Sequence, residues 1–141
     1  MTSAIVVAPS RSPATAALKY QPESAGAARR LVRRKLVEWG LDGLIDAAEV
    51  IASELVSNAV KTGCHTHMVV KIRRSTEGLI RISVRDGSRT MPVLLRAGAD
   101  DECHRGLALV DMLTGGLWGA TPDPFGKTVH ADLRVPAAQA P

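Results

Sequence analysis

The chain has 141 residues, of which 45% are hydrophobic and 23% charged, the balance of one globular domain. Aromatic residues make up only 3%, which disfavours a binder of single-stranded nucleic acid, and two cysteines exclude a disulfide framework. The net charge of +4 suits an anionic ligand or an acidic partner, and the lack of a signal peptide or of ~20 consecutive apolar residues predicts a cytoplasmic protein. We expect a mobile tail over residues 1–13, one domain over 14–135 and a C-terminal tail over 136–141.

The first half of the domain is predicted to be a strand followed by two helices. Residues 14–20 have the composition of a short edge strand. Apolar residues at helical spacing predict a helix over 23–39, with Pro22 suited to its first turn and Gly40 to its end. The same spacing predicts a second helix over 43–62.

The second half is predicted to be rich in strands. Alternating residues predict the strands, and a long aperiodic stretch predicts a loop that acts as a lid. In chain order these are strands 67–74 and 78–86, a lid over 87–105, a helix over 106–114, and strands 117–121 and 127–135. Helices in one block and hairpin-linked strands in others predict an α+β fold. This is a two-layer α/β sandwich whose mixed, mainly antiparallel sheet is covered on one face by helices.

Two polar residues of the second predicted helix are candidates for a site. Glu54 and Asn58 are four residues apart and project from one side of the helix, where Asn58 falls inside the apolar stripe and Glu54 lies at its edge. A polar group that faces a core needs a partner, so they serve either a structural hydrogen bond or a ligand. In the second case their oxygens would face a polyphosphate and Mg²⁺, which prefers hard oxygen ligands.

Three short segments carry further candidates. Asp86 and Gly87 end a predicted strand and make either a turn or a pocket whose carboxylate accepts a hydrogen bond from the amine of adenine. Arg105 and Gly106 precede a predicted helix, whose free N–H groups suit phosphate. The segment 126–128 resembles the end of a P-loop only superficially, because a strand follows it, and Walker A and Rossmann glycine patterns are absent.

Together, these segments resemble the motifs of the GHKL (Bergerat-fold) ATPase and kinase superfamily. Within it, the chain is most similar to the anti-sigma-factor serine kinases and their actinomycete relatives. The resemblance covers about residues 14–135 and rests on segments similar to the N box, the G1 and G2 boxes and the last strand. These segments are 54–61, 84–88, 105–110, 118–119 and 126–129.

The resemblance implies a role for each candidate residue. Asn58 corresponds to the asparagine that coordinates Mg²⁺, and Glu54 to the general base that takes a proton during phosphoryl transfer. Asp86 corresponds to the aspartate that reads adenine, with Gly87 lining the adenine pocket. The remaining nucleotide-binding residues implied by the family are Arg105, Gly106, Leu107 and Thr128. Thr128 is expected to lie beside Asp86 and adenine.

The resemblance also implies an activity and partners. These are binding of ATP or ADP with Mg²⁺, phosphorylation of a serine on an anti-anti-sigma (STAS-type) protein, and binding of a sigma factor. A homodimer is implied, with no membrane and no direct nucleic-acid contact. Two residues depart from the family: His104 replaces a glycine where the lid meets phosphate, and His130 stands where relatives often carry tryptophan. His104 is expected to stiffen the lid and to weaken nucleotide binding or turnover.

Three alternatives stay open on the sequence alone. The first is a nucleotide-binding regulator with little or no kinase activity, which sequesters a partner and which His104 favours. The second is a Zn²⁺ site whose spacing matches no standard zinc finger. The residues of that site are Cys64, His65, His67, Cys103 and His104. The third is a nucleic-acid binder that uses the basic face of the first helix, over 29–35, which otherwise is a solvated face or a dock for an acidic protein.

Overall fold

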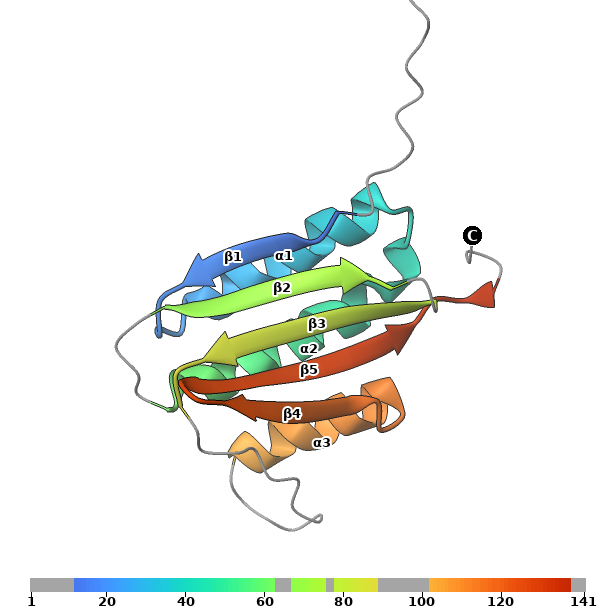
Figure 1. Ribbon diagram of the computed structural model, residues 1–141. Coiled ribbons are helices and arrows are strands. Elements are labelled where there is room, and N and C mark those ends of the chain that lie inside the picture. Colours follow the sequence, from blue (N-terminus) through green and yellow to red (C-terminus); the bar gives the residue numbers. More distant parts are fainter. Residues whose placement is uncertain (1–11, 63–66, 76–77, 89–101, 138–141) are drawn as a thin grey trace, which may run out of the picture.

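The structure is a computed structural model that describes residues 12–62, 67–75, 78–88 and 102–137, with residues 102–105 described by their helical backbone only (Figure 1). One layer is a five-stranded sheet of β1 (Ala14–Leu18), β2 (Met68–Arg74), β3 (Leu79–Asp86), β4 (Trp118–Asp123) and β5 (Gly126–Arg134). The other layer covers one face of the sheet and consists of α1 (Ser24–Glu38), α2 (Ile45–Val60), which the 3₁₀ turn η1 (Asp42–Leu44) precedes, and α3 (Glu102–Thr114). The predicted two-layer α+β sandwich is confirmed.

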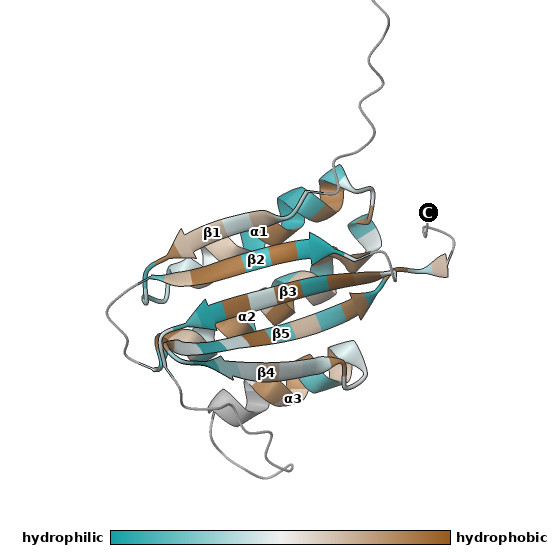
Figure 2. Cartoon of the chain, in the orientation of Figure 1, coloured by the Kyte–Doolittle hydropathy of each residue, from teal (hydrophilic) through white to brown (hydrophobic). Residues whose placement is uncertain are grey.

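The sheet has the strand order β1-β2-β3-β5-β4, and each neighbouring pair is antiparallel. Side chains alternate across a strand, so every second residue of β3 faces the helices, and Figure 2 shows the resulting alternation of hydropathy. The buried row of β3 is Ile80, Ile82, Val84 and Asp86. Its register partners on β5 are Leu133, Ala131, Val129 and Lys127. A carboxylate and an ammonium group therefore end two otherwise apolar rows.

The end of α1 shows how local chemistry shapes the helical layer. Gly40 has φ of 70°, a conformation that glycine adopts without steric cost. The N–H of Leu41 donates to the carbonyl of Leu36 at 2.8 Å, and the N–H of Gly40 donates to that of Val37 at 3.0 Å. These two bonds satisfy carbonyls that the helix end leaves unpaired. The helix therefore ends close to the predicted boundary of 23–39.

The apolar rows of the helices determine which residues of α2 are left for a site. Ile51, Leu55 and Ala59 are buried against the sheet. Glu54 and Asn58 fall beside this row and are half-buried at the edge of the layer. The packing of α2 thus fixes the direction of both polar side chains.

Two predicted boundaries are wrong. The third helix begins at Glu102 rather than at Gly106, because no glycine or proline interrupts 102–105 and an acidic residue suits a helix start. The last hairpin turns at Pro124 and Phe125 rather than over 122–126, because the carboxylate of Asp123 accepts the N–H of Phe125 at 2.8 Å.

Some predictions lie outside the described residues. They concern most of the 87–105 lid, residues 1–11 of the first tail and 138–141 of the second. Among the described residues, no helix combines the length and the apolar character needed to cross a membrane.

Candidate functional site

Three elements that carry predicted site residues come together at one end of the molecule. The end of β3, the C-terminal half of α2 and the first turns of α3 lie at the left of Figure 1, beside the start of α1. The helix α2 packs against both β3 and α3. The fold therefore brings Glu54, Asp86 and Gly106 to the same end from distant parts of the sequence.

A cleft of about 500 Å³ opens at this end between the three helices. Glu54, Ser57 and Lys61 line it from α2, and their three- and four-residue spacing puts them on one face. Gly106 and Leu109 line it from α3. The lining combines a carboxylate, a hydroxyl and an ammonium group with an apolar wall, which suits a polar small molecule. Ser57 and Lys61 were not among the predicted site residues, although their spacing from Glu54 is visible in the sequence.

Glu54 lies so close to Gly106 that no side chain fits between the two helices. A Cβ on Gly106 would overlap Oε2 of Glu54 and would lie 3.2 Å from its Cδ. Gly106 is buried in the second turn of α3. The glycine of the predicted phosphate-binding segment thus leaves room for the carboxylate of the predicted general base.

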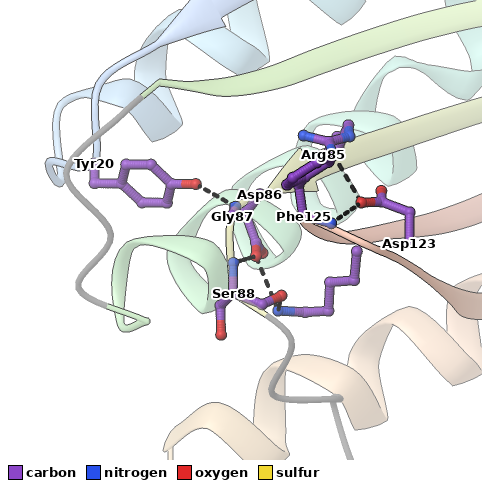
Figure 3. Close-up of polar contacts among 8 residues, drawn as sticks. Tyr20, Arg85, Asp86, Gly87, Ser88, Asp123 and Phe125 are labelled. Carbon is purple, nitrogen blue, oxygen red and sulfur yellow. Dashed lines mark hydrogen bonds and ion pairs between the residues drawn. The ribbon is translucent and has the colours of Figure 1, made fainter.

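Asp86 is the centre of a buried polar network at the end of β3 (Figure 3). Its Oδ1 accepts the N–H of Ser88 at 2.8 Å and the Nζ of Lys127 at 3.0 Å. The same Nζ donates to the carbonyl of Ser88 at 3.2 Å. The side chains of Lys127 and Asp86 are only 5% and 2% exposed. The N–H of Gly87 donates to the hydroxyl of Tyr20 at 3.0 Å, which ties the segment after β1 to this network.

The start of β5 packs directly against the backbone at Asp86. A Cβ on Gly126 would overlap the carbonyl oxygen of Asp86 and would lie 3.0 Å from the Cα of Gly87. Gly126 is buried there. A glycine at this position therefore lets the two chains approach each other at the base of the polar network.

The structure corrects the expected position of Thr128. The register of β3 and β5 pairs Thr128 with Arg85 and Lys127 with Asp86. Because side chains alternate, Thr128 points to the face of the sheet that the helices leave open. The resemblance was wrong by one residue here, since a shift of one position moves a strand residue to the opposite face.

The remaining predicted site residues differ in their burial and in their relation to the cleft. Asn58 is half-buried one turn after Glu54, and neither Asn58 nor Asp86 is among the described residues that line the cleft. Leu107 is 2% exposed, so only its backbone can meet a ligand. The side chain of Arg105 lies outside the description.

The donor set on α2 fits a magnesium ion. Mg²⁺ is commonly held by one or two side-chain oxygens together with water and substrate phosphates. Glu54 and Asn58 offer a carboxylate and a carboxamide from one side of α2, and the glycine at position 106 keeps the space beside Glu54 clear of a side chain. Both residues fit a hydrated ion bound to phosphate.

The proposed zinc site finds no support among the described residues. They contain no group of three or more His, Cys, Asp or Glu side chains that could hold a metal ion. Of the five candidate residues, only the side chain of His67 is described, and it is exposed. The prediction for the other four lies outside the described side chains.

Comparison with known proteins yields one family and a similar structure. Residues 18–129 match the model of the histidine kinase-like ATPase domain family. The fold is similar to the crystal structure of the RsbU and RsbW domains of Rv1364c from Mycobacterium tuberculosis, with a TM-score of 0.66 and 25% sequence identity. That similarity covers 87% of this chain and 32% of the other, so this chain spans about a third of the length of that relative. No match to a curated protein was found.

Proposed function

This chain belongs to the histidine kinase-like ATPase domain family, and from that premise we propose that it binds ATP where β3, α2 and α3 meet. The observation that carries the proposal is the meeting of Glu54 and Gly106 at a cleft of about 500 Å³, at the same end of the molecule as Asp86. One carboxylate, of Asp86, is thereby available for the adenine base, and another, of Glu54, for proton transfer beside the phosphates.

Recognition of the adenine base is assigned to Asp86 and Gly87. A buried carboxylate at a strand end is a strong acceptor, and the amine of adenine is a donor. Gly87 adds no side chain beside it, so a flat ring can approach the backbone. These two residues would select an adenine nucleotide over one that presents a carbonyl at the same position.

The phosphates are assigned to the α2–α3 side of the region. Asn58, with Glu54 beside it, would hold Mg²⁺, which when bound neutralises charge on the phosphates. The backbone around Gly106 and Leu107 would bind the phosphates with Arg105. Lys61, which lines the cleft, adds a second cation on the α2 side.

Phosphoryl transfer is assigned to Glu54 as general base. The carboxylate accepts the proton of a serine hydroxyl while a bond forms between the serine oxygen and the γ-phosphorus, and the bond between that phosphorus and ADP breaks. Gly106 keeps the carboxylate accessible at the cleft, since any side chain there would displace it. The contact between α2 and α3 would therefore contribute to transfer by positioning the Glu54 carboxylate.

The biological role is proposed from the similar structure, which contains an RsbW domain. We assign to this chain the phosphorylation of a serine on an anti-anti-sigma (STAS-type) protein, coupled to binding of a sigma factor. It would act as a homodimer in the cytoplasm, where ATP is available. A second candidate is a nucleotide-binding module that sequesters its partner with little transfer, and the engagement of Asp86 by Lys127 favours it.

Calorimetric titration with ATP and ADP, with and without Mg²⁺, tests the binding proposal. Asp86→Ala is expected to abolish binding, whereas Asp123→Ala, which removes a half-buried carboxylate bonded to Arg85, is expected to leave it intact. Equal affinity of the wild type and Asp86→Ala would exclude this pocket. Asp86→Asn retains acceptors for Ser88 and Lys127 and serves if the alanine variant fails to fold.

Transfer of labelled phosphate to a STAS-type protein separates the two candidate roles. Glu54→Gln is expected to retain ATP binding and to lose transfer. Glu49→Gln, on the same helix and bonded to Arg33, is the matched control and is expected to transfer phosphate normally. ATP binding without transfer in the wild type would favour the sequestering module.

A further inference from the structure

Asp86, the residue proposed to bind the adenine amine, already forms an ion pair with Lys127. The two residues are register partners on neighbouring strands, and both side chains face the helices. They are joined at 3.0 Å and are almost inaccessible. An amine that approaches Asp86 therefore meets a carboxylate that already has a cationic partner.

Both donors that reach Asp86 use the same oxygen. Ser88 N–H and Lys127 Nζ each donate to Oδ1, and among the described residues no other side-chain or loop hydrogen bond to the carboxylate of Asp86 is present. Each carboxylate oxygen has two lone pairs, so these two donors saturate Oδ1, and an amine that reaches Oδ2 meets a carboxylate whose charge Lys127 already neutralises. Lys127 also donates to the carbonyl of Ser88, which fastens the backbone that follows β3 to the start of β5.

The carboxylate of Asp86 lies outside the cleft. Neither Asp86 nor Lys127 is among the described residues that line the cleft of about 500 Å³. Among the described residues, the buried Lys127 ammonium has two acceptors, the carboxylate of Asp86 and the carbonyl of Ser88. Removing an ammonium from water is costly unless it is paired, so the pair with Asp86 is expected to persist until a competing donor weakens it.

We infer that Lys127 sets the nucleotide affinity of this site by competing with the purine 6-amine for Asp86. The inference rests on the proposed function. The competition is between two donors for one carboxylate: the Lys127 ammonium, which is charged and already in place, and the neutral amine of the incoming base. A carboxylate that is almost inaccessible and neutralised by a cation is a weaker acceptor, so the pair weakens binding of adenine nucleotides in particular.

The choice of nucleotide distinguishes this competition from a general effect of charge. ATP carries a 6-amine, which is a donor, whereas inosine triphosphate (ITP) carries a carbonyl at that position, which is an acceptor. Loss of Lys127 should therefore improve the binding of ATP and not that of ITP. A change in surface charge or in stability would alter both affinities together.

The experiment is calorimetric titration of ATP and ITP, with Mg²⁺, into wild type, Lys127→Thr and Arg81→Thr. The control breaks another ion pair between the same two strands, Arg81 with Asp132, on the open face of the sheet. Lys127→Thr is expected to bind ATP at least about tenfold more tightly than wild type, with ITP binding unchanged, while Arg81→Thr matches wild type for both. Lys127→Gln, which keeps a neutral donor of similar length, replaces Lys127→Thr if urea denaturation shows that Lys127→Thr is unfolded.

Each other outcome overturns either the inference about Lys127 or the proposed function. Unchanged or weaker ATP binding by Lys127→Thr, with measurable binding by wild type, overturns the inference and leaves the proposed function intact. Equal gains for ATP and ITP also overturn it, because they indicate a charge effect. No binding of ATP by any of the proteins defeats the proposed function and the inference together.

Discussion

Arg81 and Asp132 face each other across β3 and β5 and are joined by two parallel hydrogen bonds, from Nε to Oδ1 at 2.8 Å and from a terminal nitrogen to Oδ2 at 2.9 Å. Asp132 is 6% exposed, and its hydrogen bond raises the pKa of Arg81. The pair lies on the open face of the sheet. It stabilises the same two strands that carry Asp86 and Lys127 on the opposite face.

Arg81→Met is expected to lower the free energy of unfolding by roughly 1 kcal/mol, because solvent partly screens the Arg81 side chain while Asp132 loses its partner. Urea denaturation measures the change. Arg134→Met removes an exposed arginine from the end of β5 and is expected to have no measurable effect. Equal midpoints for Arg81→Met and the wild type would show that the pair contributes nothing.

Gly106→Ala should separate stability from activity. Alanine suits a helix interior better than glycine by about 0.5–1 kcal/mol, and the atom it would meet is the flexible end of the Glu54 side chain. We therefore expect stability within about 1 kcal/mol of wild type. We expect phosphoryl transfer at least about tenfold slower, since displacement of a catalytic group is costly.

The control for Gly106→Ala is Gly26→Ala. Gly26 lies in α1, and a Cβ there would lie 3.3 Å from the guanidinium of Arg30, which is again the end of a flexible side chain. Transfer assays and urea denaturation are run on both variants. Normal transfer by Gly106→Ala would mean that the position of Glu54 does not limit the reaction.

Gly126→Ala is expected to destabilise the fold by about 1–3 kcal/mol. Its Cβ would overlap the backbone of Asp86, which cannot move without breaking the β3–β5 ladder. Gly43→Ala is the matched control, because a Cβ at Gly43 would meet nothing within 4 Å. Thermal or urea unfolding checks the prediction, and similar midpoints for both variants would contradict the close approach.

His130 is expected to make stability depend on pH. Burial first, and then the charge of Arg81, lower its pKa below 6.5, although Asp132 opposes them. Between the folded pKa and 6.5 the unfolded chain binds more protons than the folded one, so the free energy of unfolding falls as the pH decreases. The contribution of His130 to stability is fully present above pH 6.5. It is lost as the pH falls from 6.5 through the pKa of His130 in the folded protein.

Urea midpoints at about pH 7.5 and about pH 5 test this dependence. His130→Gln should flatten the difference between the two values. His67→Gln, which alters an exposed histidine, should not. If the variant at position 130 shows the same pH dependence as wild type, another group is responsible.

Much of the fold could be predicted because its signals are local. The apolar spacing of α1 and α2 and the alternation along β3 follow from which residues avoid water, whatever the rest of the chain does. The helix end at Gly40 could be predicted because glycine adopts a positive φ, as it does here, without the help of a distant partner. Helix boundaries were predicted less accurately, since α3 begins at Glu102 and not at Gly106.

The candidate site was predictable in its residue types and less so in its contacts. Glu54 and Asn58 share one side of a helix by spacing alone. The strand register was not encoded in any local pattern, so Thr128 was expected at Asp86 where Lys127 stands. Tyr20, which bonds to Gly87, left no signal, because the two residues are 67 positions apart.

By itself, the sequence determined the layers of this protein, the apolar faces that join them and the family to which its motifs belong. Only the tertiary structure decided that Lys127 pairs with Asp86, 41 residues away, and that Gly106 lies against Glu54. Local patterns record which side chains avoid water, whereas contacts between distant segments depend on strand register and helix packing. Those are settled only when the whole chain closes around one core.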